Sequence, residues 1–280
     1  MTTFLEPLPP DPVDFDRPPV GEVALAVQLA EPATDDAITL GRFWPQVQDR
    51  YPHVESQPPL PPMNEEFSAS AVPTVSFQLL DRPPSGRYWL LNDDETELIQ
   101  VQPDRFAYNW RREPSAAEYP RYRHLRERFH EVFSTFVATA RQRGGKDVRP
   151  TWCEVTYVNP IDMPGDEDRH LDLSRILRRI SPAVATALPD PEDTSLAERY
   201  VLRRDGEPFG RMHVTATPAY SVRDQRPIYL VTLVARGLAR TPDVAGAIEF
   251  FDHGRALIVN IFKDMTTEEM HARWGINDAC

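Results

Sequence analysis

Two stretches of this chain resemble each other, residues 19–27 (PVGEVALAV) and residues 151–158 (TWCEVTYV). A short amphipathic segment follows each of them, with its first leucine at Leu40 or at Leu173. The spacing is almost constant, because the glutamates of the two stretches differ by 154 − 22 = 132 and the two leucines by 173 − 40 = 133. Self-similarity at one spacing is typical of a duplicated unit. The sequence therefore predicts two related halves.

Both halves are expected to contain a strand, a short helix, three or four strands and a long helix, in that order. The first half has expected strands at 20–29, 75–80, 86–91, 97–102 and 105–111, with helices at 39–50 and 119–143, and a proline-rich loop at 57–62. The second has expected strands at 152–159, 198–204, 209–216 and 229–235, with helices at 172–180 and from Thr241, and a short last helix from Thr266 or Thr267. Alternation of apolar residues decides the strands, and the 3.6-residue period of the apolar face decides the helices.

The predicted fold class is α+β, with two related β-α-β(3–4)-α halves whose antiparallel sheets are each gripped by a long helix. The helix-grip arrangement of TATA-binding-protein-like and Bet v 1-like proteins has this topology, which hosts many unrelated functions. The predicted divisions are a proline-rich arm at 1–19, a first half at 20–145, a second half at 146–275 and a tail at 276–280. The arm has six prolines and no hydrophobic period. We expect it either to be disordered or to wrap the surface of a partner subunit.

The composition is that of a globular protein, with 280 residues of which 41% are hydrophobic and 10% aromatic. No apolar run approaches the roughly 18 residues that a membrane-spanning helix needs. Four acidic residues precede the first basic one, and prolines interrupt the N-terminal segment, which is unlike a secretory signal. The 2 cysteines form no disulfide framework. We therefore expect reduced thiols, a cytoplasmic location and no membrane association.

The net charge of −12 argues against a general coat for nucleic acid. The charge is uneven, however, since residues 103–149 contain 11 Lys or Arg against 6 Asp or Glu. This basic stretch suggests a surface that binds an anion or a partner. The candidate binding residues within it are Arg105, Asn109, Trp110, Arg111, Arg121 and Arg128.

Residues 109–111, Asn-Trp-Arg, end a predicted strand. An amide, a ring and a guanidinium there can face a helix N-terminus, where arginine binds an anion bidentately and tryptophan stacks on a base or on a partner side chain. The alternative is structural. In that case Trp110 packs under the helix that starts near Tyr119, and Arg111 pairs with Glu113 or Glu118.

No motif in the chain names a chemistry. Glu22 and Glu154 occupy equivalent positions in the two halves, and paired carboxylates can act as acid and base, although such residues more often pair with arginine or cap a turn. The acidic segment at 166–172 lacks the ordered spacing of a calcium loop. His124 and His130 point to different faces of their helix, so they cannot share a metal ion. We expect no catalytic residue, no metal and no cofactor.

A polar cluster interrupts the apolar face of the last long helix at residues 250–255 (FFDHGR). It contains two groups suited to binding, His253 and Arg255. Gly254 weakens a helix by about 1 kcal/mol relative to alanine. Either another backbone approaches closely at this glycine, for example across a dimer interface, or it is a tolerated surface residue.

Five elements carry a resemblance to a known family: residues 98–106 (LIQVQPDRF), 108–112 (YNWRR), 119–122 (YPRY), 153–159 (CEVTYVN) and 19–23 (PVGEV). With them the chain resembles a sporadically distributed bacterial family of about this length, over most of residues 18–275. The Asn-Trp-Arg and Cys-Glu-Val-Thr-Tyr elements are the more specific ones, and Pro160, where a polar residue is expected, departs from the pattern. The resemblance implies no activity, cofactor or catalytic residue. A patchy distribution suits accessory genes such as defence systems.

The function that we expect is a non-enzymatic protein-binding or regulatory module, in a bacterial defence or toxin-neutralising system. An acidic body with a proline-rich arm suits inhibition of a basic protein partner encoded by an adjacent gene, and a homodimer is compatible with the sequence. The alternative is a protein that binds an anion, a ligand or nucleic acid through the basic stretch at 105–128, with nucleic acid less favoured. An enzyme with an unrecognised site comes third.

Overall fold

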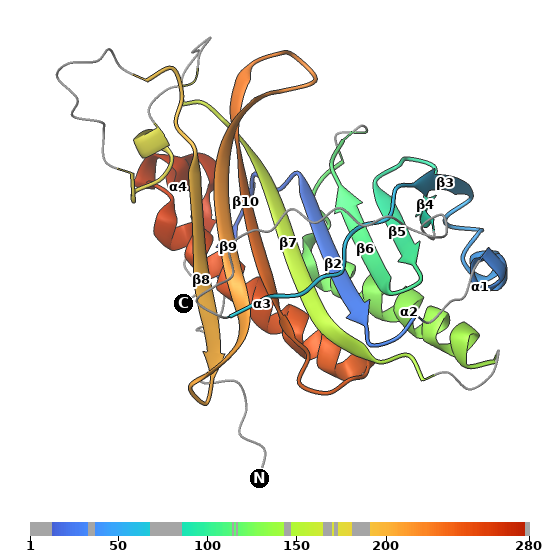
Figure 1. Ribbon diagram of the computed structural model, residues 1–280. Coiled ribbons are helices and arrows are strands. Elements are labelled where there is room, and N and C mark those ends of the chain that lie inside the picture. Colours follow the sequence, from blue (N-terminus) through green and yellow to red (C-terminus); the bar gives the residue numbers. More distant parts are fainter. Residues whose placement is uncertain are drawn as a thin grey trace.

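One large antiparallel sheet and two long helices dominate the computed structural model (Figure 1). The structure describes residues 13–32, 37–67, 86–113, 115, 117–142, 147–164, 170, 173–180 and 191–277. Across the sheet the strands follow the order β3-β4-β5-β6-β2-β7-β10-β9-β8. Their bounds are β2 Glu22–Leu29, β3 His53–Gln57, β4 Arg87–Leu91, β5 Glu97–Gln102, β6 Arg105–Arg111, β7 Pro150–Asp162, β8 Leu196–Arg204, β9 Glu207–Tyr220 and β10 Pro227–Leu238.

Four α-helices lie in the described part of the chain. They are α1 Ala37–Phe43, α2 Arg121–Gln142, α3 Val244–Met265 and α4 Glu268–Trp274. Two short 3-10 helices, η1 (Trp44–Gln46) and η2 (Leu173–Arg175), accompany them. A second, two-stranded sheet pairs β1 (Asp14–Phe15) with β11 (Ile276–Asn277).

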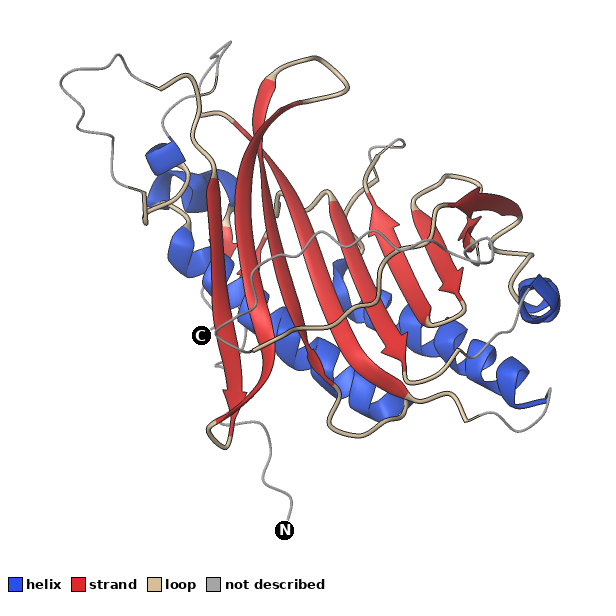
Figure 2. Ribbon diagram, in the orientation of Figure 1, coloured by secondary structure: helices blue, strands red, loops and turns tan. Residues whose placement is uncertain are grey.

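The expectation of an α+β protein with an antiparallel sheet is confirmed. α2 packs on β6, and α3 packs on β7 and β10. Both long helices therefore cover the same face of the sheet (Figure 2). β2 and β7 pair with each other near the middle of the sheet, with Ala24 opposite Thr156. The two similar stretches of sequence thus lie side by side.

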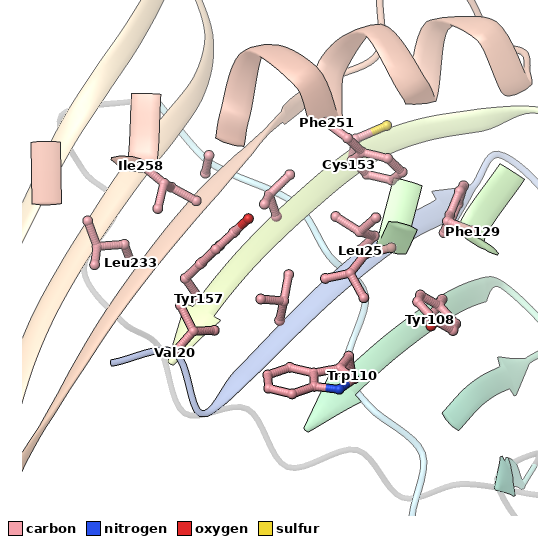
Figure 3. Packing of buried hydrophobic residues seen from close by; sticks show 14 of the residues in the cluster. Val20, Leu25, Tyr108, Trp110, Phe129, Cys153, Tyr157, Leu233, Phe251 and Ile258 are labelled. Carbon is pink, nitrogen blue, oxygen red and sulfur yellow. The ribbon is translucent and has the colours of Figure 1, made fainter. Parts of the chain in front are cut away.

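Alternation along the strands decides which side chains enter the core. Leu25, Tyr108 and Tyr157 are almost fully buried on the face that the helices cover. Above them, Phe129 of α2 and Phe251 of α3 meet edge to face with ring centroids 4.8 Å apart (Figure 3). Because rings from both helices meet over the sheet, one hydrophobic core extends across β2 and β7.

An extended segment, residues 58–67, crosses the opposite face of the sheet, and we call it the strap (Figure 1). The proline-rich loop predicted at 57–62 covers the last residue of β3 and the first half of the strap. The buried side chain of Met63 packs against Ala26 and Ala107. The backbone N–H of Met63 donates to the Gln28 side chain at 2.9 Å. Polar side chains of the sheet thus satisfy the backbone of a segment with no secondary structure.

The helix predicted at 172–180 is wrong. Of the described residues in that segment, Leu173–Arg175 alone are helical, in one 3-10 turn. The N–H of Arg178 donates to the carbonyl of Met265, and the carbonyl of Ile176 accepts from Thr267. Backbone N–H and C=O groups that a helix would have paired internally are therefore hydrogen-bonded to the junction of α3 and α4.

Other elements differ in detail from the expectation. The strand expected at 75–80 lies outside the described residues, while β3 was not expected. The helix expected at 39–50 forms as α1 followed by η1. The N-cap of α3 is Asp243 rather than Thr241, since the Asp243 carboxylate accepts from the N–H of Gly246 at 2.8 Å. As predicted, α4 begins after Thr267 and ends at Gly275, whose φ is 67°.

Candidate functional site

A cavity of about 260 Å³ lies on the helix side of the sheet, under the first described residues of the chain. Residues 13–20, which include the described end of the predicted proline-rich arm and are called the arm from here on, form one wall. The other walls come from residues 119–123 at the start of α2, from Tyr157 and Asn159 on β7, and from residues 255–262 of α3. The arm and α3 contribute mainly apolar side chains, while tyrosines, arginines and Asn159 supply the polar groups.

Two tyrosines meet at the cavity, with the hydroxyl oxygens of Tyr119 and Tyr157 3.0 Å apart. Tyr157 points from β7 to the helix side and lies between Val20 and Ile258 (Figure 3). The ring of Trp110, 5.4 Å away between centroids, packs against Tyr119. Burial raises the pKa of both hydroxyls, so both stay protonated at neutral pH. One proton bridges the pair, and the other remains available for donation.

Arg255 brings a positive charge to the cavity wall. Its guanidinium lies 5.6 Å from the centre of the Tyr122 ring, a cation–π contact. Its Nε is buried without a hydrogen-bond partner among the described residues. The nearby Asp252 is engaged elsewhere, because it accepts from the Tyr122 hydroxyl at 2.8 Å and from Arg126 at 2.7 Å.

The arm is attached through aromatic packing and a short strand pairing. The ring of Phe15 stands edge to face against Phe262 at 5.9 Å and against Trp274 at 6.0 Å. Beside it, β1 pairs with β11, and the N–H of Asp16 donates to Gly275 at 2.8 Å. These contacts hold the arm over the cavity.

Arg121 attaches the arm to α2. Its side chain donates to the carboxylate of Asp14 at 3.0 Å and to the carbonyls of Phe15 and Asp16 at 2.9 and 3.1 Å. Its backbone has a φ of 72°. A left-handed conformation costs a non-glycine residue on the order of 1 kcal/mol. The three hydrogen bonds offset this cost, so Arg121 binds the chain's own arm.

Arg105 and Asn109 lie on the strap side of the sheet. Arg105 donates to the carbonyl of Pro61 in the strap at 2.8 Å, and burial lowers its pKa. The amide of Asn109 accepts from Gln100 at 2.8 Å and donates to Glu22 at 2.7 Å. Both candidate residues therefore hold the strap or the sheet together.

The strand pleat separates the members of the Asn-Trp-Arg element, because consecutive residues point to opposite faces. Trp110 is 3% exposed and packs on Tyr119, as the structural alternative predicted. Arg111 donates to the carbonyl of Glu95 at 2.7 Å, rather than pairing with Glu113 or Glu118. The three residues therefore do not face one site.

Arg128 is also engaged, through an ion pair with Glu131 at 2.5 Å one turn along α2. Of the six candidate binding residues, Arg121 lines the cavity, and Trp110 packs against Tyr119, which also lines it. The other four lie elsewhere.

Glu22 and Glu154 do not form a paired carboxylate site. Glu154 lies opposite Ala26 on β2, so four residues, or about 13 Å along the strand, separate it from Glu22. Glu22 accepts from Asn109, while Glu154 pairs with Arg236 at 2.5 Å. Two carboxylates so far apart cannot share a proton.

A charged network joins the strap to the second half of the sheet. The Glu65 side chain, 6% exposed, pairs with Arg211 at 2.6 Å, with Arg236 at 3.2 Å and with the His213 ring at 2.6 Å. Burial raises the pKa of Glu65, but the hydrogen bonds from His213 and Arg211 outweigh it and lower the pKa to about 2. The carboxylate is therefore ionised and acts as a clamp.

Other reactive groups show no such arrangement. Burial raises the pKa of the Cys153 thiol, which keeps it protonated. Within the described ranges, no three or more His, Cys, Asp or Glu residues are grouped to hold a metal ion, and the acidic residues 166–168 lie outside those ranges. Of the helices that the structure describes, none is long and apolar enough to cross a bilayer.

Comparisons with protein-family models, with curated proteins and with solved structures each found no match. The resemblance to a bacterial family drawn from short motifs therefore stays a prediction. The case for the cavity as a functional site depends on its own geometry.

Arg121 and Arg255 are candidate binding residues from the sequence, but nothing in the sequence places them at the same site. The Tyr119–Tyr157 pair was missed as a site, because its members lie 157 − 119 = 38 residues apart and meet only through strand order. The available signal was a polar cluster at 250–255 on an otherwise apolar helix face. Side chains opposite such a cluster are the place to look for a site.

Proposed function

We propose that the protein binds a small, mainly apolar molecule in the cavity under the arm. The observation that carries this proposal is a cavity of about 260 Å³ with apolar walls and a few convergent polar groups. That combination is typical of ligand sites. An apolar cavity of about 150 Å³ already binds benzene, whereas pockets for drug-sized ligands begin at roughly 300 Å³. The ligand is therefore larger than benzene and smaller than a typical drug.

An opening of the arm would widen the access to the cavity. The arm forms one wall of the cavity, and its described contacts gather around Phe15 and Arg121. Val13, Phe15 and Val20 of the arm are buried, so its release exposes apolar surface. Its strand pairing is limited to β1 with β11, and we therefore expect it to open at a lower free energy than the nine-stranded sheet does.

Filling the cavity tests this proposal. Val259 lines the cavity from α3 and is only partly buried, so Val259→Trp occupies the space without displacing a fully buried side chain. Native mass spectrometry of protein purified from its own cell should detect a bound small molecule on the wild type and none on V259W. Ala138→Trp is the control, because Ala138 is exposed on α2 and does not line the cavity.

The proposal is wrong if two results coincide. The first is a wild-type protein that carries no small molecule. The second is a set of small apolar compounds that shifts the melting temperature of neither the wild type nor V259W, since binding to the folded state must raise it.

A protein partner is the second candidate, favoured by the outer edge of β8. In the described part of the sheet β8 pairs with β9 alone, and Val201 on it is 42% exposed. A free edge of this length can accept a strand from another chain. Pull-down from the native cell with nuclease treatment should recover a stoichiometric protein, and Val201→Lys should abolish its recovery. Leu238→Lys, at an exposed position of the interior strand β10, should not.

We also propose that the chain consists of two related halves with the helix-grip topology. In each half the first strand pairs with the last, β2 with β6 and β7 with β10, and a long helix follows. Register supports the relation, because Glu22 lies opposite Arg111 and Glu154 lies opposite Arg236. Superposing β2, β6 and α2 of an experimental structure on β7, β10 and α3 should bring Glu22 onto Glu154. A mismatch in strand register would contradict the duplication.

A further inference from the structure

Among the described residues that line the cavity, one cation remains available. Three arginines contribute to the wall, namely Arg121, Arg123 and Arg255. Arg121 is taken by the arm through three hydrogen bonds. Arg123 points to solvent, with a side chain 90% exposed, and pairs with Glu127 at 3.1 Å.

Arg255 differs from the other two. No ion pair among the described residues includes it, and its Nε has no hydrogen-bond partner there. Asp14 is the one carboxylate in the described lining, and Arg121 holds it at 3.0 Å. A partly buried guanidinium without a counter-ion is costly unless something neutralises it. The position of Arg255 thus calls for an anion that the described protein does not supply.

Hydrogen-bond donors surround the same place. The Tyr119 and Tyr157 hydroxyls share one hydrogen bond at 3.0 Å, which leaves one O–H to donate. Burial raises the pKa of the Tyr157 hydroxyl, and the hydrogen bond to Tyr119 together with the charge and hydrogen bond of the Arg255 guanidinium partly offset that effect. A carboxylate suits this set of donors, because its two oxygens can accept from two N–H groups of the guanidinium and from the tyrosine O–H beside them.

We propose that the ligand is a small organic monocarboxylate, whose carboxylate binds Arg255 and the Tyr119–Tyr157 pair while its apolar body fills the space between the arm and α3. This inference depends on the proposed function and gives it a ligand class. A phosphate ester fits less well, because its second negative charge would enter an apolar cavity with one available cation. A neutral compound leaves Arg255 without a counter-ion.

Isothermal titration calorimetry on the full-length protein tests the charge requirement. The probes are benzoate and hexanoate, with benzamide and hexanamide as neutral analogues of the same shape and inorganic phosphate as a second anion. Both acids should bind at least about 10-fold more tightly than their amides, because charge-assisted hydrogen bonds are the stronger ones. Inorganic phosphate should not displace them.

Variants identify the group responsible. Arg255→Gln should weaken acid binding about 10- to 100-fold and leave amide binding unchanged. Arg255→Lys, which keeps the charge but not the planar fork, should lose less. Arg128→Gln is the matched control on α2, where Arg128 pairs with Glu131 away from the cavity. Tyr157→Phe is a second probe, expected to cost a few-fold, in case the Arg255 variants fold poorly.

The results distinguish a failure of the carboxylate assignment from a failure of the proposed small-molecule site. If acids and amides bind equally, and R255Q binds both like the wild type, the carboxylate assignment is wrong while a small-molecule site remains. If neither class binds at millimolar concentration, the carboxylate assignment is wrong, and the proposed function fails with it when the wild type also carries no small molecule and no apolar compound raises its melting temperature. Acid binding that R128Q removes and R255Q does not would also overturn the assignment.

Discussion

Replacing Glu65 by glutamine should destabilise the protein by about 2–3 kcal/mol at neutral pH. The magnitude follows from the pKa of its carboxyl, which falls from 4.5 to about 2 in the fold. The difference of 4.5 − 2 = 2.5, at about 1.4 kcal/mol for each pKa unit, gives an upper value of about 3.5 kcal/mol. The partners Arg211 and Arg236 are 15% and 29% exposed, so solvent screens part of this interaction.

The pH dependence has a definite sign. Because the pKa of Glu65 is lower in the folded protein, its contribution is fully present above about pH 4.5 and is lost as the pH falls towards about 2. Glutamine cannot titrate. The stability difference between wild type and E65Q should therefore shrink in acid, as protonation removes the charge that the substitution has already removed.

Urea unfolding at neutral pH and in acid measures both effects. Glu66→Gln is the control, since the Glu66 side chain is exposed and its backbone carbonyl alone accepts a hydrogen bond from Arg211, at 2.9 Å. E66Q should unfold like the wild type. If E65Q also unfolds at the wild-type urea concentration at neutral pH, Glu65 does not clamp the strap and the electrostatic reasoning is refuted.

Two further substitutions test how the arm is held and how closely α3 packs on the sheet. Phe15→Ala should release the arm and so raise the rate of hydrogen exchange at the arm amides. The free energy of unfolding should fall by less than the roughly 3–5 kcal/mol of a core Phe→Ala change. If the arm amides stay protected in this variant, the packing of Phe15 on Trp274 does not hold the arm in place. Gly254→Val should lower the free energy of unfolding by about 1–3 kcal/mol, because a Cβ there meets Val155 at 3.2 Å. Gly41→Val, with nothing within 4 Å of an added Cβ, should be nearly neutral, and equal losses for both would contradict close packing at Gly254.

Elements governed by local pattern were predictable from the sequence. Strands β5 and β6 have the expected bounds, 97–102 and 105–111, because their alternation is local. The Asp205–Gly206 turn was equally legible, with φ values of 52° and 83° that suit a two-residue hairpin. The apolar face of α2 gave its extent to within two residues at each end.

Elements governed by distant contacts were not predictable. Strand β3 is polar and exposed, and it forms because its backbone pairs with β4. Residues 172–180 look amphipathic, yet their backbone bonds to the α3–α4 junction. The path of the strap depends on partners such as Gln28 and Arg211, which no spacing in the sequence connects to it.

The candidate site illustrates the same limit. Gly254 was recognised as a point of close approach or a surface residue, and it is buried against β7 and β10. Arg255 was recognised as a group suited to binding, but its partners were not. Three separate segments bring Tyr119, Tyr157 and the arm to it, and their meeting depends on strand order.

The most direct test of a carboxylate-binding cavity is a crystal structure of the wild-type protein grown with hexanoate. Electron density for the acid is expected between the arm and α3, with its carboxylate within hydrogen-bond distance of Arg255 and of the Tyr119 or Tyr157 hydroxyl. A cavity that holds water alone at saturating hexanoate, or an acid bound elsewhere on the protein, would contradict this prediction.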